Sequence, residues 1–118
     1  MGYTHYFRQK GPAPTNEQWD EVKKAAQVVI KKHKKLLCFE YNEPKAAPVV
    51  SDDLIRFNGK GEDGHETFYL EKNQNGFAFC KTARKPYDDA VVEMLKAVRD
   101  VCPGWLELGS DGGDEIFN

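Results

Sequence analysis

The fold is decided by the longest regular stretch of the sequence, TNEQWDEVKKAAQVVIKKHKKLL, which spans residues 15–37. Thr15 and Gln18 have the spacing of a capping box, in which each side chain bonds the backbone N–H of the other residue. From Trp19 onward, apolar residues recur at intervals of three and four. This spacing predicts an amphipathic helix over residues 16–37, and its lysine-rich second half suits the negative end of the helix dipole.

A second apolar stripe runs from Tyr87 to Val101 near the end of the chain. Pro86 suits the first turn of a helix there, because its missing N–H would have no partner in any case, and Pro103-Gly104 would end that helix. Shorter segments that are rich in aromatic and β-branched residues predict strands. These segments are residues 3–7, 54–57, 67–71, 76–81 and 105–108.

The resulting element order is β-α-β-β-β-α-β. Short turns between consecutive strands, among them the Asn75-Gly76 turn, favour antiparallel pairing. Two helices that are each apolar on one side need a common surface to cover. We therefore predict a single α+β domain over residues 1–118, in which two helices pack on one mostly antiparallel sheet and form a two-layer structure.

Charge, cysteine content and hydropathy limit the classes of function. The formal net charge of −2 argues against a dedicated nucleic-acid-binding protein, and no specific nucleic-acid partner is expected. The cysteines Cys38, Cys80 and Cys102 form no CxxC motif, which favours a reducing compartment. The N-terminal residues lack the pattern of a signal peptide, and no apolar run approaches the roughly 20 residues that span a bilayer. We therefore expect a cytoplasmic protein without a membrane partner.

The main candidate for a binding site is the segment CKTARKPYD at residues 80–88. It leads from a predicted strand into a predicted helix, whose free N–H groups would favour an anion. Lys81, Arg84 and Lys85 would add positive charge and Thr82 a hydroxyl donor, so that the segment could hold a phosphate group. The alternative is that these cations lie on a solvated turn and that the final aspartate only helps the helix to start.

Two other segments contribute candidate residues. Asn58 begins a glycine-rich turn whose backbone allows a ligand to approach closely, and we count it among the ligand contacts. His65 and Glu66 follow as a candidate acid–base pair, although neighbours on a strand face opposite sides. His5 is a candidate acid–base group or ligand contact beside aromatic residues. The alternative for each is a structural role in a loop, a strand or the core. No metal or other cofactor is expected, because the histidines and cysteines lack ligand spacing.

Several segments of the chain carry distinctive short motifs. They are Met1-Gly2-Tyr3-Thr4-His5-Tyr6-Phe7, Phe57-Asn58-Gly59 with Gly64-His65-Glu66-Thr67-Phe68, Phe79-Cys80-Lys81-Thr82-Ala83-Arg84-Lys85-Pro86-Tyr87-Asp88, and Ser110-Asp111-Gly112. Together these segments resemble a family of small bacteriophage and prophage proteins, and the resemblance spans nearly the whole chain. It carries no assigned activity, and it implies a phage-encoded protein that acts in the bacterial cytoplasm, in a setting where small phage proteins counter host defence.

Three functions stay open on these grounds. The first is the binding of a phosphorylated, nucleotide-like molecule without cleavage, which would sequester a host defence signal. The second is an inhibitory interaction with a host protein. The third is a metal-independent phosphoesterase, with His5 or His65 as acid or base, Glu66 as an orienting group, and Lys81 or Arg84 to stabilise charge on the phosphate. A homo-oligomer is a further open alternative, because a small domain can build a pocket at a subunit boundary.

Overall fold

The structure is a computed structural model that describes residues 3–118, so Met1 and Gly2 of the MGYTHYF segment lie outside the described residues. The helices are α1 (Asn16–Lys32) and α2 (Asp88–Val101). The strands are β1 (Thr4–Gln9), β2 (Leu37–Cys38), β3 (Val49–Val50), β4 (Leu54–Gly59), β5 (Phe68–Glu71), β6 (Phe77–Lys81) and β7 (Leu106–Ser110). Short 3-10 helices η1 (Gly61–Asp63) and η2 (Asp114–Phe117) follow β4 and β7. Among the described residues, neither helix has the length and apolar run that a membrane span requires.

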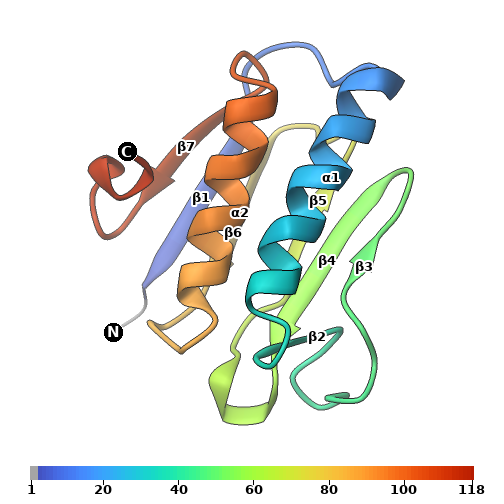
Figure 1. Ribbon diagram of the computed structural model, residues 1–118. Helices are drawn as coiled ribbons and strands as arrows, with labels where there is room; N and C mark the ends of the chain where they lie inside the picture. The colour runs from blue at the N-terminus through green and yellow to red at the C-terminus, as the bar shows by residue number, and fades with distance from the viewer. Residues whose placement is uncertain (1–2) are drawn as a thin grey trace.

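Both helices lie side by side on the same face of the strands, which confirms the predicted α+β class (Figure 1). The strands form two hydrogen-bonded groups, one in the order β6-β1-β7 and one in the order β2-β4-β3, with β5 also paired to β4. All of these pairs are antiparallel. The groups meet where β5 contacts β6, and the Glu66 N–H donates to the Lys81 carbonyl at 3.2 Å near this seam. The sheet is therefore divided in two, whereas the sequence predicted one.

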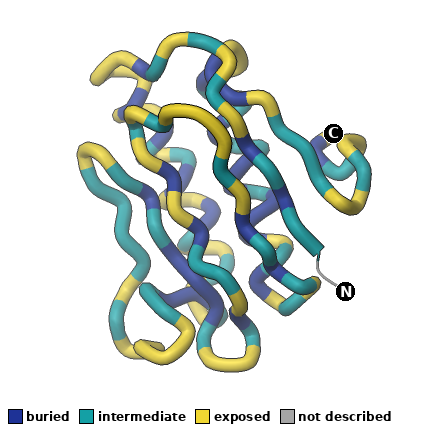
Figure 2. Tube along the Cα trace, turned by 180° about the vertical axis from the view of Figure 1, so that it is seen from behind, coloured by how far each residue is buried: buried dark blue, intermediate teal, exposed yellow. Residues whose placement is uncertain are grey.

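Strand β1 is the central strand of the three-stranded group. His5 lies opposite Cys80 on β6 and opposite Ser110 on β7. Side chains alternate along a strand, so His5 and Phe7 are buried beneath the helices while the residues between and beside them face away. Figure 2 looks onto this second face, which no helix covers.

Helix α1 begins at the predicted residue and ends earlier than predicted. Thr15 Oγ1 accepts the Gln18 N–H at 3.1 Å, and Gln18 Oε1 accepts the Thr15 N–H at 2.8 Å, so the capping box is formed. The helix stops at Lys32, and the prediction that it continues to Leu37 is wrong. The physical reason is competition: Leu37 and Cys38 pair with β4 as the short strand β2 and are both buried there.

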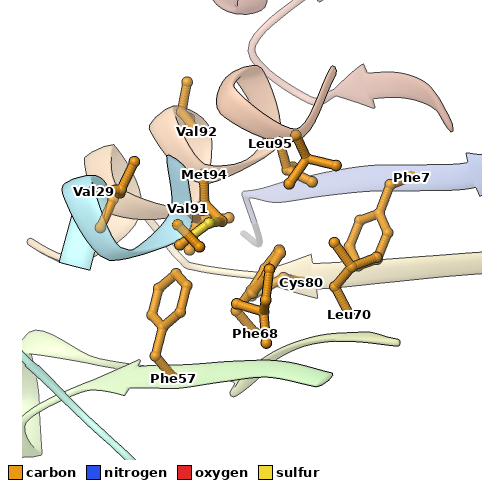
Figure 3. Packing of buried hydrophobic residues seen from close by; sticks show 14 of the residues in the cluster. Phe7, Val29, Phe57, Phe68, Leu70, Cys80, Val91, Val92, Met94 and Leu95 are labelled. Atoms are coloured by element: carbon orange, nitrogen blue, oxygen red, sulfur yellow. The ribbon is translucent and has the colours of Figure 1, made fainter. Parts of the chain in front are cut away.

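One apolar core joins the two helices to both groups of strands. Figure 3 shows Phe57 and Phe68 beneath Val91 and Met94 of α2. The Phe57 and Phe68 rings stack with their centroids 5.0 Å apart. Cys80 lies in the same cluster, and burial raises the pKa of its thiol to about 12, so it is a packed core residue that stays protonated at neutral pH.

Candidate functional site

A buried polar cluster ties the start of β1 to the start of α2 and to the end of β7. His5 is completely buried, with its Nε2 2.7 Å from Asp88 Oδ1 and its Nδ1 2.8 Å from Ser110 Oγ. Thr82 is also completely buried, and its hydroxyl donates to the same Asp88 oxygen. Both ring nitrogens of His5 therefore have partners inside the protein, as a buried imidazole requires.

The contact with Asp88 favours the tautomer of His5 in which Nε2 carries the proton. Burial alone would raise the pKa of Asp88, but hydrogen bonds from His5 and Thr82 outweigh this effect and hold the pKa below its ordinary value. When the ionised carboxylate accepts the Nε2–H of a neutral ring, Nδ1 is left with the free lone pair. Ser110 can then donate to Nδ1 while its Oγ accepts the Gly112 N–H at 3.0 Å. Aspartate, histidine and serine follow one another in the order that activates a serine nucleophile in hydrolases.

The turn between β6 and α2 is fixed to the start of β1. Ala83 and Arg84 have φ values of 52° and 58°, in the left-handed region that residues with side chains seldom adopt. The Tyr3 carbonyl accepts the Thr82 N–H at 2.9 Å and the Ala83 N–H at 3.1 Å, and the Lys85 N–H bonds the Thr82 carbonyl at 3.0 Å. These N–H groups are used inside the protein, so the expected cradle of free backbone N–H groups does not form in this turn.

The side chains of this turn point to different places. The Arg84 guanidinium lies 4.2 Å from the centroid of the Tyr3 ring, in a cation–π contact beside the polar cluster. Lys85 instead lines a surface hollow of about 390 Å³, together with Tyr41, Gly64, His65 and Glu66. The hydroxyl of Thr82, which was expected to contact a ligand, is committed to Asp88. The four predicted residues of the turn therefore do not converge on one anion.

The hollow brings the glycine-rich segment with His65 and Glu66 together with Lys85 of the segment at residues 80–88. His65 is exposed, and Glu66 is half-buried with one carboxylate oxygen accepting the Lys81 N–H at 2.7 Å. Tyr41 is 52% exposed, so its ring is accessible. Lys81 itself lies on the outer face of β6, opposite Thr4, and does not line the hollow.

Asn58 shapes one wall of the hollow. Its Nδ2 donates to the His65 carbonyl and to the Thr67 hydroxyl at 3.1 Å each, while its Oδ1 accepts the N–H groups of Gly59 and His65 at 2.7 and 3.1 Å. The buried side chain has no polar atom left for a ligand, so the expected ligand contact by Asn58 has no support. Gly64 packs directly on it, and a Cβ there would overlap Asn58 Oδ1 and the Gly59 carbonyl.

Sequence reasoning missed three partners of the predicted residues. Ser110 and Asp88 contact His5 across 105 and 83 positions of the chain, and no local pattern reports such a contact. Tyr41 lies in a connection without periodicity, so nothing in the sequence singles it out. The sequence offered two weak signals for the partners of His5: the polar turn at Ser110 and the aspartate that begins α2.

Within residues 3–118, no three side chains of His, Cys, Asp or Glu are placed to hold a metal ion together. Comparisons of the chain with protein-family models, with curated proteins and with solved structures gave no match. We therefore infer function from the geometry of the chain itself.

Proposed function

We propose that the protein binds a small phosphorylated, nucleotide-like molecule in the hollow beside the β6–α2 turn. The observation that carries this proposal is that Lys85 and His65, from two separate segments, meet there beside the exposed ring of Tyr41. The volume of about 390 Å³ lies within the range of ordinary small-molecule sites.

The lining residues match the three parts of a nucleotide. The Tyr41 ring offers a flat surface on which a base can stack. One oxygen of Glu66 is held by the Lys81 N–H, which fixes the carboxylate so that its other oxygen can accept a ribose hydroxyl. Lys85 supplies a point charge for phosphate oxygens, and His65 adds a ring nitrogen that can donate to them.

Binding without cleavage is the form of this activity that fits the resemblance to phage proteins. A protein that holds a signalling nucleotide lowers its free concentration in the infected cell by mass action. The expected result is that the nucleotide is recovered intact after long incubation with a molar equivalent of protein, as measured by chromatography. Formation of a cleaved product would instead favour a hydrolase.

Titration calorimetry with ADP, ADP-ribose, cyclic dinucleotides and inorganic pyrophosphate tests the site directly. Lys85→Ala and Tyr41→Ala should each weaken the binding of the best ligand about tenfold or more, which corresponds to about 1.4 kcal/mol. Lys24→Ala is the matched control, because Lys24 is an exposed lysine on α1. The proposal fails if none of these compounds binds, or if Lys85→Ala and Lys24→Ala behave alike.

A hydrolase is a second candidate, and the Asp88–His5–Ser110 chain favours it. Ser110 Oγ would attack a phosphoryl or acyl centre, and its proton would pass to His5 Nδ1 and then to the leaving group. Water would release the product from Ser110 in a second step, with Arg84 available to stabilise negative charge. Ser110 and Asp88 are half-buried, whereas His5 has no exposed surface.

Activated p-nitrophenyl phosphodiesters and carboxylic esters provide the test of this second candidate. Ser110→Ala should abolish p-nitrophenol release, and Ser51→Ala should leave it unchanged because Ser51 lies beside Trp19 and Asp53. Equal rates for wild type and Ser110→Ala would remove the hydrolase from consideration and leave the binding function untouched.

A further inference from the structure

The face of the sheet opposite the helices carries three neighbouring aromatic rings, which we call the aromatic face. Tyr6 on β1 lies opposite Phe79 on β6, and Phe77 follows on the same side of β6. Ring centroids are 5.8 Å apart for Tyr6 and Phe77, and 6.0 Å apart for Phe77 and Phe79. Phe77 and Phe79 are 59% and 54% exposed. Figure 2 views the molecule from this side.

Strand β6 has the reverse of the usual distribution of side chains. Ala78 and Cys80 point into the core, while the much larger Phe77 and Phe79 point to solvent. Single exposed apolar residues are common, but a contiguous group on an uncovered sheet face is typical of an interaction site. The tilt of 30–37° between neighbouring rings leaves parts of their faces free to stack on other flat groups.

We propose that the aromatic face binds single-stranded nucleic acid, with bases stacked on the rings and phosphates held by Arg8 and Lys81. Cross-strand pairing places Arg8 beside Phe77 and Lys81 next to Phe79 along β6, so a cation lies at each end of the group of rings. Lys81 has no ion-pair partner within residues 3–118. Arg8 pairs with Glu107, and both side chains are more than half exposed, so the pair is weak and Arg8 can turn to a phosphate.

The charges around the aromatic face indicate the path that a nucleic-acid strand would take across it. Three carboxylates border the rings, and all lie toward β7: Glu107 opposite Arg8, Asp111, which accepts the Tyr6 hydroxyl at 2.6 Å, and Asp114, which lines one hollow with Tyr6 and Phe77. Phosphates would be repelled there and attracted along β6. The net charge of −2 is an average over the whole chain, so it does not report on this local arrangement.

The sequence of β6 has the residue order that RNA-recognition motif domains use for the same purpose. Gly76-Phe77-Ala78-Phe79 follows their order of glycine, aromatic, small residue and aromatic on a strand whose rings stack bases. Asn75 stands where that motif has a basic residue, and Thr82 where it ends with an aromatic. Stacking on rings tolerates any base, so little sequence preference is expected.

Fluorescence anisotropy with labelled RNA and DNA strands of about 12 nucleotides, and with the corresponding duplexes, tests the proposal. We expect both single strands to bind more tightly than either duplex, and the RNA and DNA arms show whether the 2′-hydroxyl contributes. Replacing both phenylalanines, Phe77→Ala with Phe79→Ala, should weaken binding about tenfold or more. Val28→Ala on α1, another exposed apolar residue, should change nothing.

Lys81→Gln gives a second test that leaves the rings in place. It should weaken binding and reduce its salt dependence between about 50 and 200 mM. Lys85→Ala should leave the binding of single-stranded nucleic acid unchanged. This test of the aromatic face therefore does not depend on whether the hollow binds a nucleotide. Tight duplex binding, no binding, or insensitivity to the phenylalanine substitutions would overturn the proposal. So would a wild-type dimer in sedimentation that those substitutions dissociate, because the face would then be covered by a second copy.

Discussion

His5 and His65 stand in opposite environments on the two sides of the β6–α2 turn. His5 has no exposed surface, and both ring nitrogens are bonded to side chains from α2 and β7. His65 is exposed, and its backbone N–H and carbonyl are both bonded to the Asn58 side chain. The His5 ring is therefore held by two side chains, whereas the His65 ring is free and the Asn58 side chain holds only the backbone of that residue.

This difference indicates that His5 matters for the stability of the fold and His65 for the binding of a ligand. A buried cluster in which every polar group has a partner is needed for stability. If one member is removed, the others are left unpaired and away from water, which costs free energy. A residue held through its backbone leaves its ring free to meet a ligand. We therefore expect substitutions at His5 to act on folding, and substitutions at His65 to act on binding.

The largest effect is expected for His5→Ala, which leaves Asp88 and Ser110 without their partner and opens a cavity. Unfolding in urea should show a loss of about 3 kcal/mol in the free energy of unfolding. A loss below about 1 kcal/mol, which is ordinary for a point substitution, would mean that the cluster does not support the fold and that the two histidines are less different than their burial indicates.

Gly64→Ala should have the next largest effect, because a Cβ at this position overlaps the Asn58 side chain and the Gly59 backbone. We expect a loss of about 2 kcal/mol in the free energy of unfolding, together with weaker ligand binding in the hollow. Gly104→Ala is the matched control, since no atom lies within 4 Å of a Cβ there. Equal stability of the two variants would contradict the close packing of this wall.

The pH dependence of stability sharpens the comparison further. The pKa of Asp88 is below its ordinary value of 3.8 in the folded protein, so its stabilising contribution is complete above that pH and is lost as the pH falls through the folded value. Wild type should therefore lose stability below about pH 4 more steeply than Asp88→Asn does. Thermal melts from neutral to acidic pH measure this, with the exposed Asp114→Asn as control. Parallel curves for wild type and Asp88→Asn would show that the carboxylate is not held in its charged form.

The smallest effect on stability is expected for His65→Ala. Its ring makes no hydrogen bond or ion pair within residues 3–118, so the thermal midpoint should match that of wild type. The same variant should bind the best ligand of the hollow less tightly in calorimetry. A midpoint lowered as far as that of His5→Ala would remove the distinction between the two residues.

Local signals in the sequence predicted most of the fold. The capping box at Thr15 and the apolar stripe toward Val101 each depend on neighbouring residues, so their elements could be placed without knowing the rest. The end of α1 and the strands β2 and β3 could not be placed in this way. Each of these strands has two residues and forms only against β4.

The candidate site was predictable only in part, for the same reason. His65, Glu66 and Lys85 lie in segments that the sequence analysis singled out as candidates, and the structure places them around one hollow. The roles of Asn58 and Thr82 depend on burial, which a polar residue in a turn does not reveal. The direction of Phe77 and Phe79 could have been inferred from their alternation with small residues, had the side that faces the helices been known.

The position of β1 between β6 and β7 has a consequence for synthesis on the ribosome. Strand β1 has no partner strand until residues 77–81 are made, and its second neighbour, β7, ends only at Ser110. The nascent chain must therefore carry an unpaired strand, with Phe7 exposed, while α1 and the strands β2 to β5 are made, and the three-stranded group closes only after β7 has been made. A stop codon placed just before Leu106 would leave β1 with one open edge, and the truncated product would be a target for chaperones and proteases.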